Sequence, residues 1–225
     1  MKFETSINRR TSGKHRASAR MENFKGKTIL DVGCSFGIFE KLIEKKAKKI
    51  LAIDISGDDL KIAKKEVKTK NIQFQKGGVF DIQKITKEKF DIVTFFDVIE
   101  HIPKNSEIKA LKIINNSLEK QGILLLTTPK SNFTNFLDPA WYFGHRHYNE
   151  NEIREFLKKS GFKTKKRYSR GGFFEIFSMF LFYFCKWIFN SEIPYKDWFD
   201  KKRNIEYLDR EGYVTWFIVA QKQKH

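Results

Sequence analysis

Short apolar runs alternate with charged stretches over most of the chain, starting at Lys27. The apolar runs have the length and composition of strands covered on both faces, and the charged stretches carry apolar residues at helical spacing. This alternation predicts an α/β protein with a doubly wound, mostly parallel sheet. Strands are expected at Lys27–Val32, Ile50–Ile55, Ile72–Gln75, Phe90–Phe96 and Gly122–Thr127. Helices are expected at Phe36–Lys48, Asp58–Lys68 and Ser106–Leu118.

The last third of the chain has a less regular pattern. A helix is expected at Glu150–Ser160, where Gly161 ends it, and a strand at Lys163–Ser169. Tyr213–Ala220 has the composition of a terminal strand, and we expect it to complete the sheet in antiparallel orientation.

The segment Phe173–Asn190 contains seven phenylalanines. Its uninterrupted apolar stretch, Met179–Cys185, is too short to predict a membrane-spanning helix. Three interpretations stay open: a core helix, a lid that forms a greasy acceptor pocket, or a surface that rests in a membrane interface. We treat 173–200 as an aromatic helical insertion or lid within a single domain that spans 27–225.

The chain carries 44 Lys and Arg against 27 Asp and Glu, a formal net charge of +17. Such a charge favours acidic partners, namely RNA, anionic lipid surfaces or phosphorylated metabolites, and a lysine-rich composition explains it equally well. Residues 1–26 form a basic N-terminal segment, in which Arg9–Arg20 is expected to be a basic cap or a loosely ordered start.

Two cysteines, Cys34 and Cys185, are far apart and have no C-x-x-C spacing. This argues against a disulfide framework or a structural zinc site and for a reducing compartment. No secretory signal is visible at the N-terminus. We therefore expect a cytoplasmic location, with peripheral membrane contact left open.

A turn rich in small residues, Asp31–Gly37 (DVGCSFG), joins the first expected strand to its helix. Glycines at such a turn let the backbone approach a ligand closely. Counted from Gly33, a dinucleotide-binding G-x-G-x-x-G pattern would need glycine where Ser35 and Ile38 stand. A P-loop fails as well, because no Gly-Lys-Ser/Thr follows. The turn is typical of neither site.

The turn resembles the first motif of class I S-adenosylmethionine-dependent methyltransferases, an acidic residue followed by G-x-G-x-G, with Ser35 in the middle glycine place. Acidic residues follow the second and third strands, as in that family. Asp97–Ile102 (DVIEHI), after the fourth strand, is similar to the D/E-x-x-E-H segment of the ubiquinone-type methyltransferases. The resemblance covers about Lys27 to Phe162, and it implies a Rossmann-like fold and S-adenosylmethionine as cofactor.

The resemblance also assigns cofactor-binding positions. They are Asp31, Gly33, Ser35, Gly37, Asp54, Ile55, Phe80, Asp81 and Asp97. In the family, the acid matching Asp54 accepts hydrogen bonds from the ribose hydroxyls, and the acid matching Asp81 reads the adenine amino group. Each position also has a structural alternative. Asp31 could be a solvated strand-end acid, the glycines could only make turns, Asp54 could cap the next helix, and Asp81 could be an ordinary loop acid.

Three histidines are candidates for the base that an alcohol or phenol acceptor needs. His101 follows the fourth strand and so faces the expected cofactor crevice. His145 and His147 lie in a segment that resembles the H-x-R-x-Y/F-type segment near the acceptor pocket of the same subfamilies. The alternative for this pair is packing against nearby aromatic residues, which are Trp141, Tyr142 and Phe143. The other two, His15 and His225, lie near the termini and are poor candidates.

A divalent cation is the other chemistry that the D/E-x-x-E-H segment holds in some relatives. The matching residues are Asp97, Glu100 and His101. Oxygen ligands with one imidazole suit Mg²⁺, Mn²⁺ or Fe²⁺. We expect no metal, because Glu100 and His101 can instead cap and orient the next helix.

The sequence therefore predicts a methyltransferase that acts on oxygen, or on carbon or nitrogen, of a small or lipid-linked molecule. An RNA methyltransferase is one alternative, because of the net charge and because the D/E-x-x-E-H and H-x-H layout also resembles small-RNA 2′-O-methyltransferases that use a metal. No aromatic-basic RNA-binding module is visible. A non-catalytic binding protein that keeps the fold is the third hypothesis.

Overall fold

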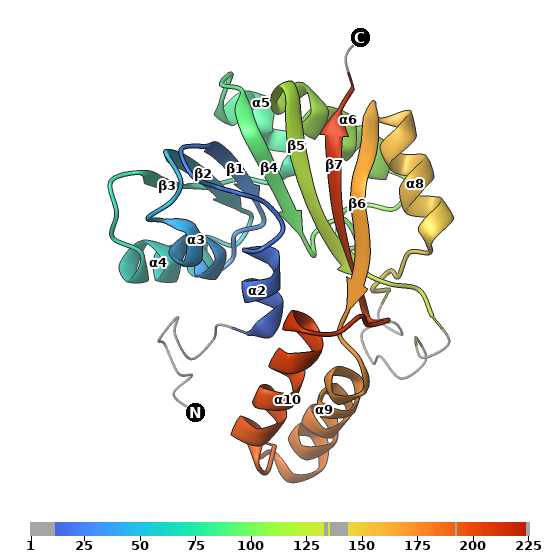
Figure 1. The fold of residues 1–225 in the computed structure, drawn as a ribbon. Helices are drawn as coiled ribbons and strands as arrows, with labels where there is room; N and C mark the ends of the chain where they lie inside the picture. Colours follow the sequence, from blue (N-terminus) through green and yellow to red (C-terminus); the bar gives the residue numbers. More distant parts are fainter. Residues whose placement is uncertain (1–11, 133–134, 136–143, 192, 224–225) are drawn as a thin grey trace.

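The computed structural model describes residues 12–132, 135, 144–191 and 193–223, in which seven strands form one sheet (Figure 1). The strand order is β3-β2-β1-β4-β5-β7-β6. Strands β1 to β5 run parallel, and β7 runs antiparallel to β5 and β6. The strands are β1 (Thr28–Val32), β2 (Lys49–Asp54), β3 (Ile72–Lys76), β4 (Phe90–Phe96), β5 (Leu118–Pro129), β6 (Phe162–Arg170) and β7 (Thr215–Lys222). The predicted Rossmann-like sheet with an antiparallel C-terminal strand is confirmed.

Helices cover both faces of the sheet. They are α2 (Gly13–Ser18), α3 (Ile38–Ile43), α4 (Gly57–Glu66), η1 (Val79–Asp81), α5 (Ile82–Ile85), α6 (Glu107–Ser117), α8 (Glu150–Lys159), α9 (Phe173–Phe184), η3 (Cys185–Phe189) and α10 (Lys196–Leu208). Because side chains alternate along a strand, Leu30 and Val32 of β1 pack with α5, α6 and α8, whereas Ile29 packs with α2, α3 and α4. Two cores result, one on each face.

Some element boundaries differ from the sequence prediction. Helix α3 ends at Ile43, earlier than expected, because the chain turns there and buries Ala47 against the sheet. Strand β5 begins earlier than expected, since Leu118 already pairs with Phe90 before a shift in register. Helix α10 continues to Leu208, beyond the expected end of the aromatic insertion.

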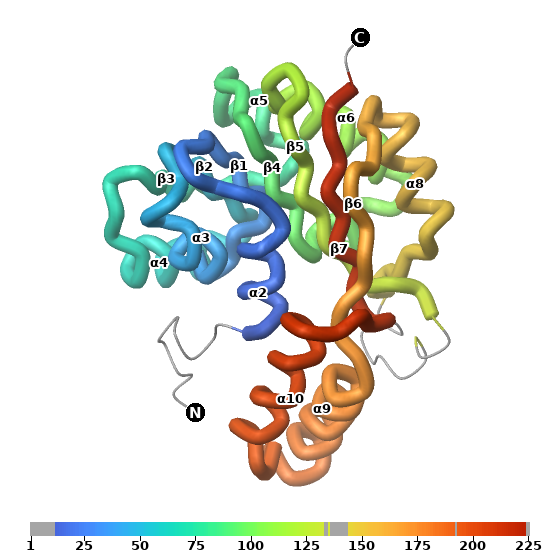
Figure 2. The backbone as a smooth tube through the Cα atoms, viewed as in Figure 1, coloured from blue at the N-terminus to red at the C-terminus, as the bar shows by residue number. Residues whose placement is uncertain are grey.

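The N-terminal segment is helical from Gly13 rather than a loose start. Helix α2 packs against α3 and α10. A Cβ on Gly13 would lie 2.7 Å from the Cα of Asn204, so the backbones of α2 and α10 are in direct contact. Figure 2 shows α2 between the β1 side of the sheet and α10.

The aromatic insertion forms a helical hairpin of α9, η3 and α10 between β6 and β7. It leaves the sheet at the edge where β1 to β5 end (Figure 1). Within α9 only Ser178 is buried, so the core-helix interpretation is wrong. Among the described residues, no helix is long and apolar enough to cross a membrane.

Candidate active site

The candidate site lies at the carboxyl ends of β1, β2 and β4. From β1 the chain builds outward through β2 and β3 on one side and through β4 and β5 on the other. The neighbouring strands β1 and β4 therefore form the topological switch point, where open α/β sheets bind ligands.

The small-residue turn wraps tightly over this switch point. Gly33 has φ +90°, and a Cβ there would lie 2.3 Å from Cγ2 of Val98. Its N–H donates to the Ile53 carbonyl at 2.8 Å. Gly37 has φ +76° and lies against Ala63 and Phe74 of the neighbouring elements. Both positions thus need glycine for backbone shape and for space.

Ser35 occupies the middle glycine place in the left-handed region, with φ +47°. Its N–H donates to Asp54 Oδ2 at 2.8 Å, and its hydroxyl donates to Asp59 Oδ2 at 2.9 Å. Left-handed backbone costs a serine about 1 kcal/mol. These two hydrogen bonds offset that cost and hold the turn against β2.

Asp54 projects from the end of β2 and lies partly exposed beside the turn. One carboxylate oxygen accepts from Ser35 N, and the other accepts from Ser56 N at 2.8 Å. The alternative role as cap of α4 is wrong, because Ser56 is the N-cap and accepts from Asp59 N at 3.2 Å. Each Asp54 oxygen has capacity for one more donor, as a ribose diol would require.

Next to Asp54, an apolar side chain stands in solvent. Ile55 is 74 % exposed, and a Cβ on Gly78 would lie 3.2 Å from its Cγ2. Asp81 Oδ2 accepts from Gly78 N at 3.0 Å. Ile55 and Asp81 therefore flank Gly78, so that the apolar face of Ile55 lies beside the carboxylate of Asp81. The Phe80 side chain is partly buried and packs against the core.

Asp31 lies under the turn rather than in solvent. It is buried, accepts a hydrogen bond from the Thr94 hydroxyl, and neighbours the buried Glu40. The solvated strand-end interpretation is therefore wrong. Burial first, and then the charge of Asp31, raise the pKa of Glu40, so the folded environment favours its protonated form.

Asp97 follows β4 with φ +53° and is anchored on both carboxylate oxygens. One accepts from the Thr127 hydroxyl at 3.1 Å, and the other lies 2.7 Å from Lys14 Nζ of helix α2. Burial alone would lower the pKa of Lys14, but the charges of Asp97 and Tyr207 raise it overall, so the lysine stays charged. The spacing of the sequence motifs gave no indication that Lys14 would contact Asp97. The buried positions Ala17, Met21 and Phe24, at helical intervals, could have shown that this segment packs on the domain.

The three candidate histidines lie together. The ring centroids of His101 and His145 are 4.8 Å apart, and those of His145 and His147 are 5.8 Å apart. His147 Nδ1 is hydrogen-bonded to Asn135 Oδ1 at 3.0 Å. Partial burial, and then the neighbouring His145, lower the pKa of His101, so its imidazole is neutral at neutral pH. The alternative packing partners at 141–143 lie outside the described residues.

Alternation along an extended segment explains this grouping. Tyr148 pairs with Lys130 in a bridge at the end of β5. Arg146 donates to the carbonyls of Ile99 and Ile102, at 2.8 and 2.6 Å, and the Tyr148 hydroxyl donates to Ile99 at 3.2 Å. Arg146 and Tyr148 therefore tie the segment to the loop after β4. The alternating positions His145 and His147 lie on the other side, where His145 meets His101 and His147 meets His145.

Residues 7–166 match the family model described as "Methyltransferase domain". The chain belongs to the class I methyltransferases that depend on S-adenosylmethionine.

Curated relatives of this methyltransferase include two ubiquinone biosynthesis O-methyltransferases. The protein from Glaesserella parasuis is 34% identical over 109 residues, which cover 46% of this chain and 45% of the relative. The protein from Coxiella burnetii is 30% identical over 117 residues, which cover 50% of this chain and 48% of the relative. The matched region thus spans about half the length of each relative.

Solved structures share the fold along nearly the whole chain. An S-adenosylmethionine-dependent methyltransferase from Archaeoglobus fulgidus has a TM-score of 0.66 at 17% identity and covers 95% of this chain and 96% of its own. Another, from Mesorhizobium loti, has a TM-score of 0.63 at 15% identity and covers 96% of this chain and 100% of its own.

The residues of this methyltransferase fit the cofactor that the family uses. Gly33 leaves no space for a side chain, Asp54 has acceptor capacity for a diol, and Ile55 beside Asp81 offers a surface for a flat heterocycle. A candidate metal site is also present, because ligand atoms of Glu100, His101 and His145 are within 4.8 Å of one another. Asp97, which matches a metal position in some relatives, is not in this group, and its Oδ2 lies 2.7 Å from Lys14 Nζ.

Proposed function

We propose that this methyltransferase methylates a hydroxyl oxygen of a small-molecule acceptor, and that a histidine of the cluster His101, His145 and His147 takes the hydroxyl proton. The observation that carries the proposal is this cluster. His101 belongs to the loop after β4, and Val98 of the same loop lies against Gly33 of the small-residue turn. The relatives named ubiquinone biosynthesis O-methyltransferases support an oxygen acceptor.

S-adenosylmethionine, when bound, supplies an electrophilic methyl group carried by a sulfonium. The chain must hold the acceptor oxygen about 3 Å from the methyl carbon and in line with the breaking bond. In the transfer, a carbon–oxygen bond forms, the carbon–sulfur bond breaks, and the hydroxyl proton passes to an imidazole nitrogen. Positioned histidines commonly contribute about 10²- to 10⁴-fold to such proton transfers.

Glu100 contacts the histidine cluster from its buried side. Its side chain is buried, one oxygen accepts from Thr128 at 3.0 Å, and the other lies 3.9 Å from His145 Nε2. Burial first, and then Asp97, raise the pKa of Glu100 to about 8. The carboxyl is thus placed to orient His145, and the exposed His101 is the group best placed to reach an acceptor.

Calorimetry with S-adenosylmethionine tests the cofactor half of the proposal. Asp54→Asn should weaken binding about 10- to 100-fold, because a charged acceptor of two hydroxyl groups is lost. Asp58→Asn, on the exposed surface of α4, is the matched control and should bind as the parent does. Unchanged affinity in Asp54→Asn would contradict the ribose assignment.

An acceptor screen tests the chemistry half. Phenols and alcohols, amines, and RNA are offered separately, and formation of the demethylated cofactor is followed. His101→Gln should slow transfer to a hydroxyl at least roughly 100-fold while cofactor affinity stays unchanged. Turnover with RNA or amines alone would overturn the proposal.

A divalent cation is the second candidate for the same cluster, favoured by the closeness of the ligand atoms of Glu100, His101 and His145. Treatment with a chelator distinguishes a metal site from a histidine base. Activity that survives prolonged treatment with EDTA assigns a histidine base. Activity that is lost and returns with Mn²⁺ or Mg²⁺, together with Mn²⁺ binding that His145→Gln abolishes, assigns a metal site.

A further inference from the structure

The hairpin of α9, η3 and α10 exposes aromatic side chains that a soluble domain normally buries. Phe173, Phe177, Phe180 and Phe184 are all exposed, and their spacing of four, three and four residues places them in one stripe along α9. Within the stripe, the rings of Phe173 and Phe177 are stacked, and so are those of Phe180 and Phe184. The result is an ordered apolar face with no covering element among the described residues.

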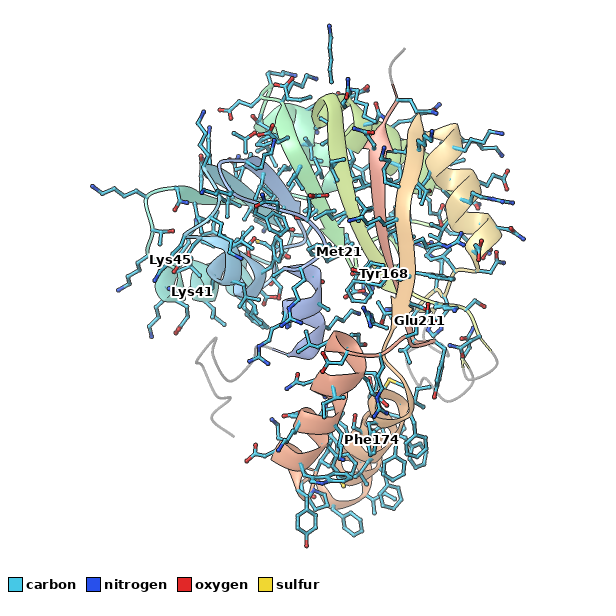
Figure 3. All side chains as sticks on the ribbon, viewed as in Figure 1. Met21, Lys41, Lys45, Tyr168, Phe174 and Glu211 are labelled. Atoms are coloured by element: carbon cyan, nitrogen blue, oxygen red, sulfur yellow. The ribbon has the colours of Figure 1, made fainter. Side chains whose placement is uncertain are left out.

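The stripe continues to the tip of the hairpin. Trp187, Ile188 and Phe189 are 64 %, 61 % and 64 % exposed, and Tyr195 and Trp198 join them from the start of α10. Figure 3 shows the aromatic side chains gathered around and beyond Phe174, on the part of the molecule farthest from the upper end of the sheet. Trp and Tyr at a projecting tip are typical of surfaces that lie at the level of lipid headgroups.

Lysines flank this aromatic surface. Lys186 Nζ lies 5.6 Å from the centroid of Phe182, and Lys202 Nζ lies 5.5 Å from that of Trp198. Lys201 is exposed on α10. Long cationic side chains beside apolar rings can reach anionic headgroups while their stems cover apolar surface.

The acidic side chains of the hairpin are largely used inside it. Glu175 pairs with Arg203 at 2.6 Å, and Asp200 pairs with Lys196 at 2.8 Å. Glu206 accepts three backbone N–H groups at the start of α9. The hairpin is therefore a fixed element, and its flanking lysines remain at the surface.

We propose that the tip and stripe of the hairpin insert into the interfacial region of an anionic lipid bilayer. The net charge of +17 attracts such a surface and opposes the approach of a second copy of the chain, so it favours a bilayer as the occupant. The hairpin lies along the bilayer surface or dips into it, because none of the described helices can span it.

The same geometry indicates the class of acceptor, an inference that rests on the proposed function. The hairpin leaves the sheet at the edge where the candidate active site lies (Figure 1). Docking of the tip therefore brings that edge to the bilayer surface. The acceptor is then a hydroxyl compound with a lipid tail, whose head reaches the histidine cluster while the tail stays in the bilayer.

Vesicle co-sedimentation tests the membrane contact in the absence of cofactor and acceptor. Vesicles of phosphatidylcholine alone are compared with vesicles that contain one third phosphatidylglycerol. We expect binding to the anionic vesicles and at least roughly tenfold weaker binding to the neutral ones. The double variant Trp187→Ser/Phe189→Ser should bind at least about tenfold more weakly. The exchange Trp187→Phe/Phe189→Trp keeps the aromatic composition and should bind like the parent.

Charge is tested by a second matched pair. Lys186→Glu/Lys201→Glu should weaken binding to anionic vesicles at least roughly tenfold. Lys45→Glu/Lys46→Glu makes the same change in net charge just after α3 and should have a smaller effect, because Figure 3 shows Lys45 on a part of the molecule away from the hairpin. Equal effects of the two charge variants, unchanged binding in the serine variant, or a stable dimer that the serine variant dissociates would overturn the proposal.

The acceptor inference has its own readout. Transfer to a phenol with a polyprenyl tail in vesicles is compared with transfer to the same phenol without the tail. The inference is supported if the parent prefers the tailed phenol and the variant Trp187→Ser/Phe189→Ser loses this preference. Equal rates for the two phenols contradict it. Because sedimentation needs no turnover, loss of vesicle binding and failure of the methyltransferase proposal are distinguishable.

Discussion

At the scale of single residues, Gly33 combines a left-handed backbone with a very close contact. Its φ is +90°, and an added Cβ would lie 2.3 Å from Val98. Gly33→Ala should destabilise the fold by at least about 2 kcal/mol, because backbone strain and a clash combine, and it should weaken cofactor binding. Thermal melts with and without S-adenosylmethionine measure both effects. Gly57→Ala is the control, because no atom lies within 4 Å of a Cβ added at Gly57. It should melt at or slightly above the parent's temperature.

Glu40 gives a pH prediction at the same scale. Burial and Asp31 raise its pKa in the folded state, so the folded protein keeps a proton that the unfolded chain loses above the ordinary pKa of Glu. The stabilisation is complete below that ordinary value and is lost as pH rises, by up to about 1.4 kcal/mol per pH unit. Glu40→Gln should therefore match the parent near pH 5 and become progressively more stable than it at higher pH.

Chemical denaturation of Glu40→Gln at pH 5, 7 and 9 measures this difference. Glu88→Gln, at an exposed ion pair with Lys49, is the control. Parallel stability curves for Glu40→Gln and the parent would show that Glu40 is ionised in the folded protein.

The sequence predicted which residues gather at the site better than it predicted how each one is used. Asp54 and the three histidines could be placed because each lies at a strand end or in a motif, and strand ends meet at one edge. The burial of Asp31 beside Glu40 could not be predicted, since it depends on how α3 packs over β1. Lys14 was missed for a similar reason, because the packing of α2 on α3 and α10 brings it to Asp97.

At the scale of elements, strands were predicted well where burial on both faces makes the sequence continuously apolar, as in β4. An aromatic helical insertion was predicted here, but its burial stayed open, because a run of phenylalanines has the same pattern in a core and on a surface. Its conformation depends on Glu206, which accepts from the N–H groups of Gly172, Phe174 and Glu175 at 2.9 to 3.1 Å.

Removal of this carboxylate should loosen the first turn of α9. Glu206→Ala leaves three N–H groups at a helix N-terminus without their acceptor, which should cost about 2 kcal/mol. Faster hydrogen exchange at residues 172–175 and earlier proteolysis in the hairpin measure it. Glu211→Ala, exposed in the loop before β7, is the control and should leave both rates unchanged. Exchange rates that stay at the parent's level in Glu206→Ala would show that Glu206 does not hold the hairpin.

At the scale of the whole molecule, Lys14 connects three parts that are far apart in the sequence. It comes from α2, its ammonium lies 2.7 Å from Asp97 after β4, and α2 rests on α10 of the hairpin. Lys14→Met keeps most of the length of the side chain and removes the charge. Because the pair is only partly buried, the expected cost is about 1 to 2 kcal/mol, or roughly 2 to 8 °C in melting temperature. Lys61→Met breaks a fully exposed pair with Asp58 and should leave the melting temperature close to that of the parent.

The same variant shows whether the hairpin and the site are mechanically joined. If α2 transmits the position of the hairpin to Asp97, Lys14→Met should weaken cofactor binding as well as lower the melting temperature, because Asp97 at φ +53° loses one of its two anchors. Calorimetry at a temperature where the variant is fully folded separates the two effects. A lower melting temperature with unchanged cofactor affinity would mean that the Thr127 hydrogen bond alone fixes Asp97, and that the N-terminal helix stabilises the domain without shaping its site.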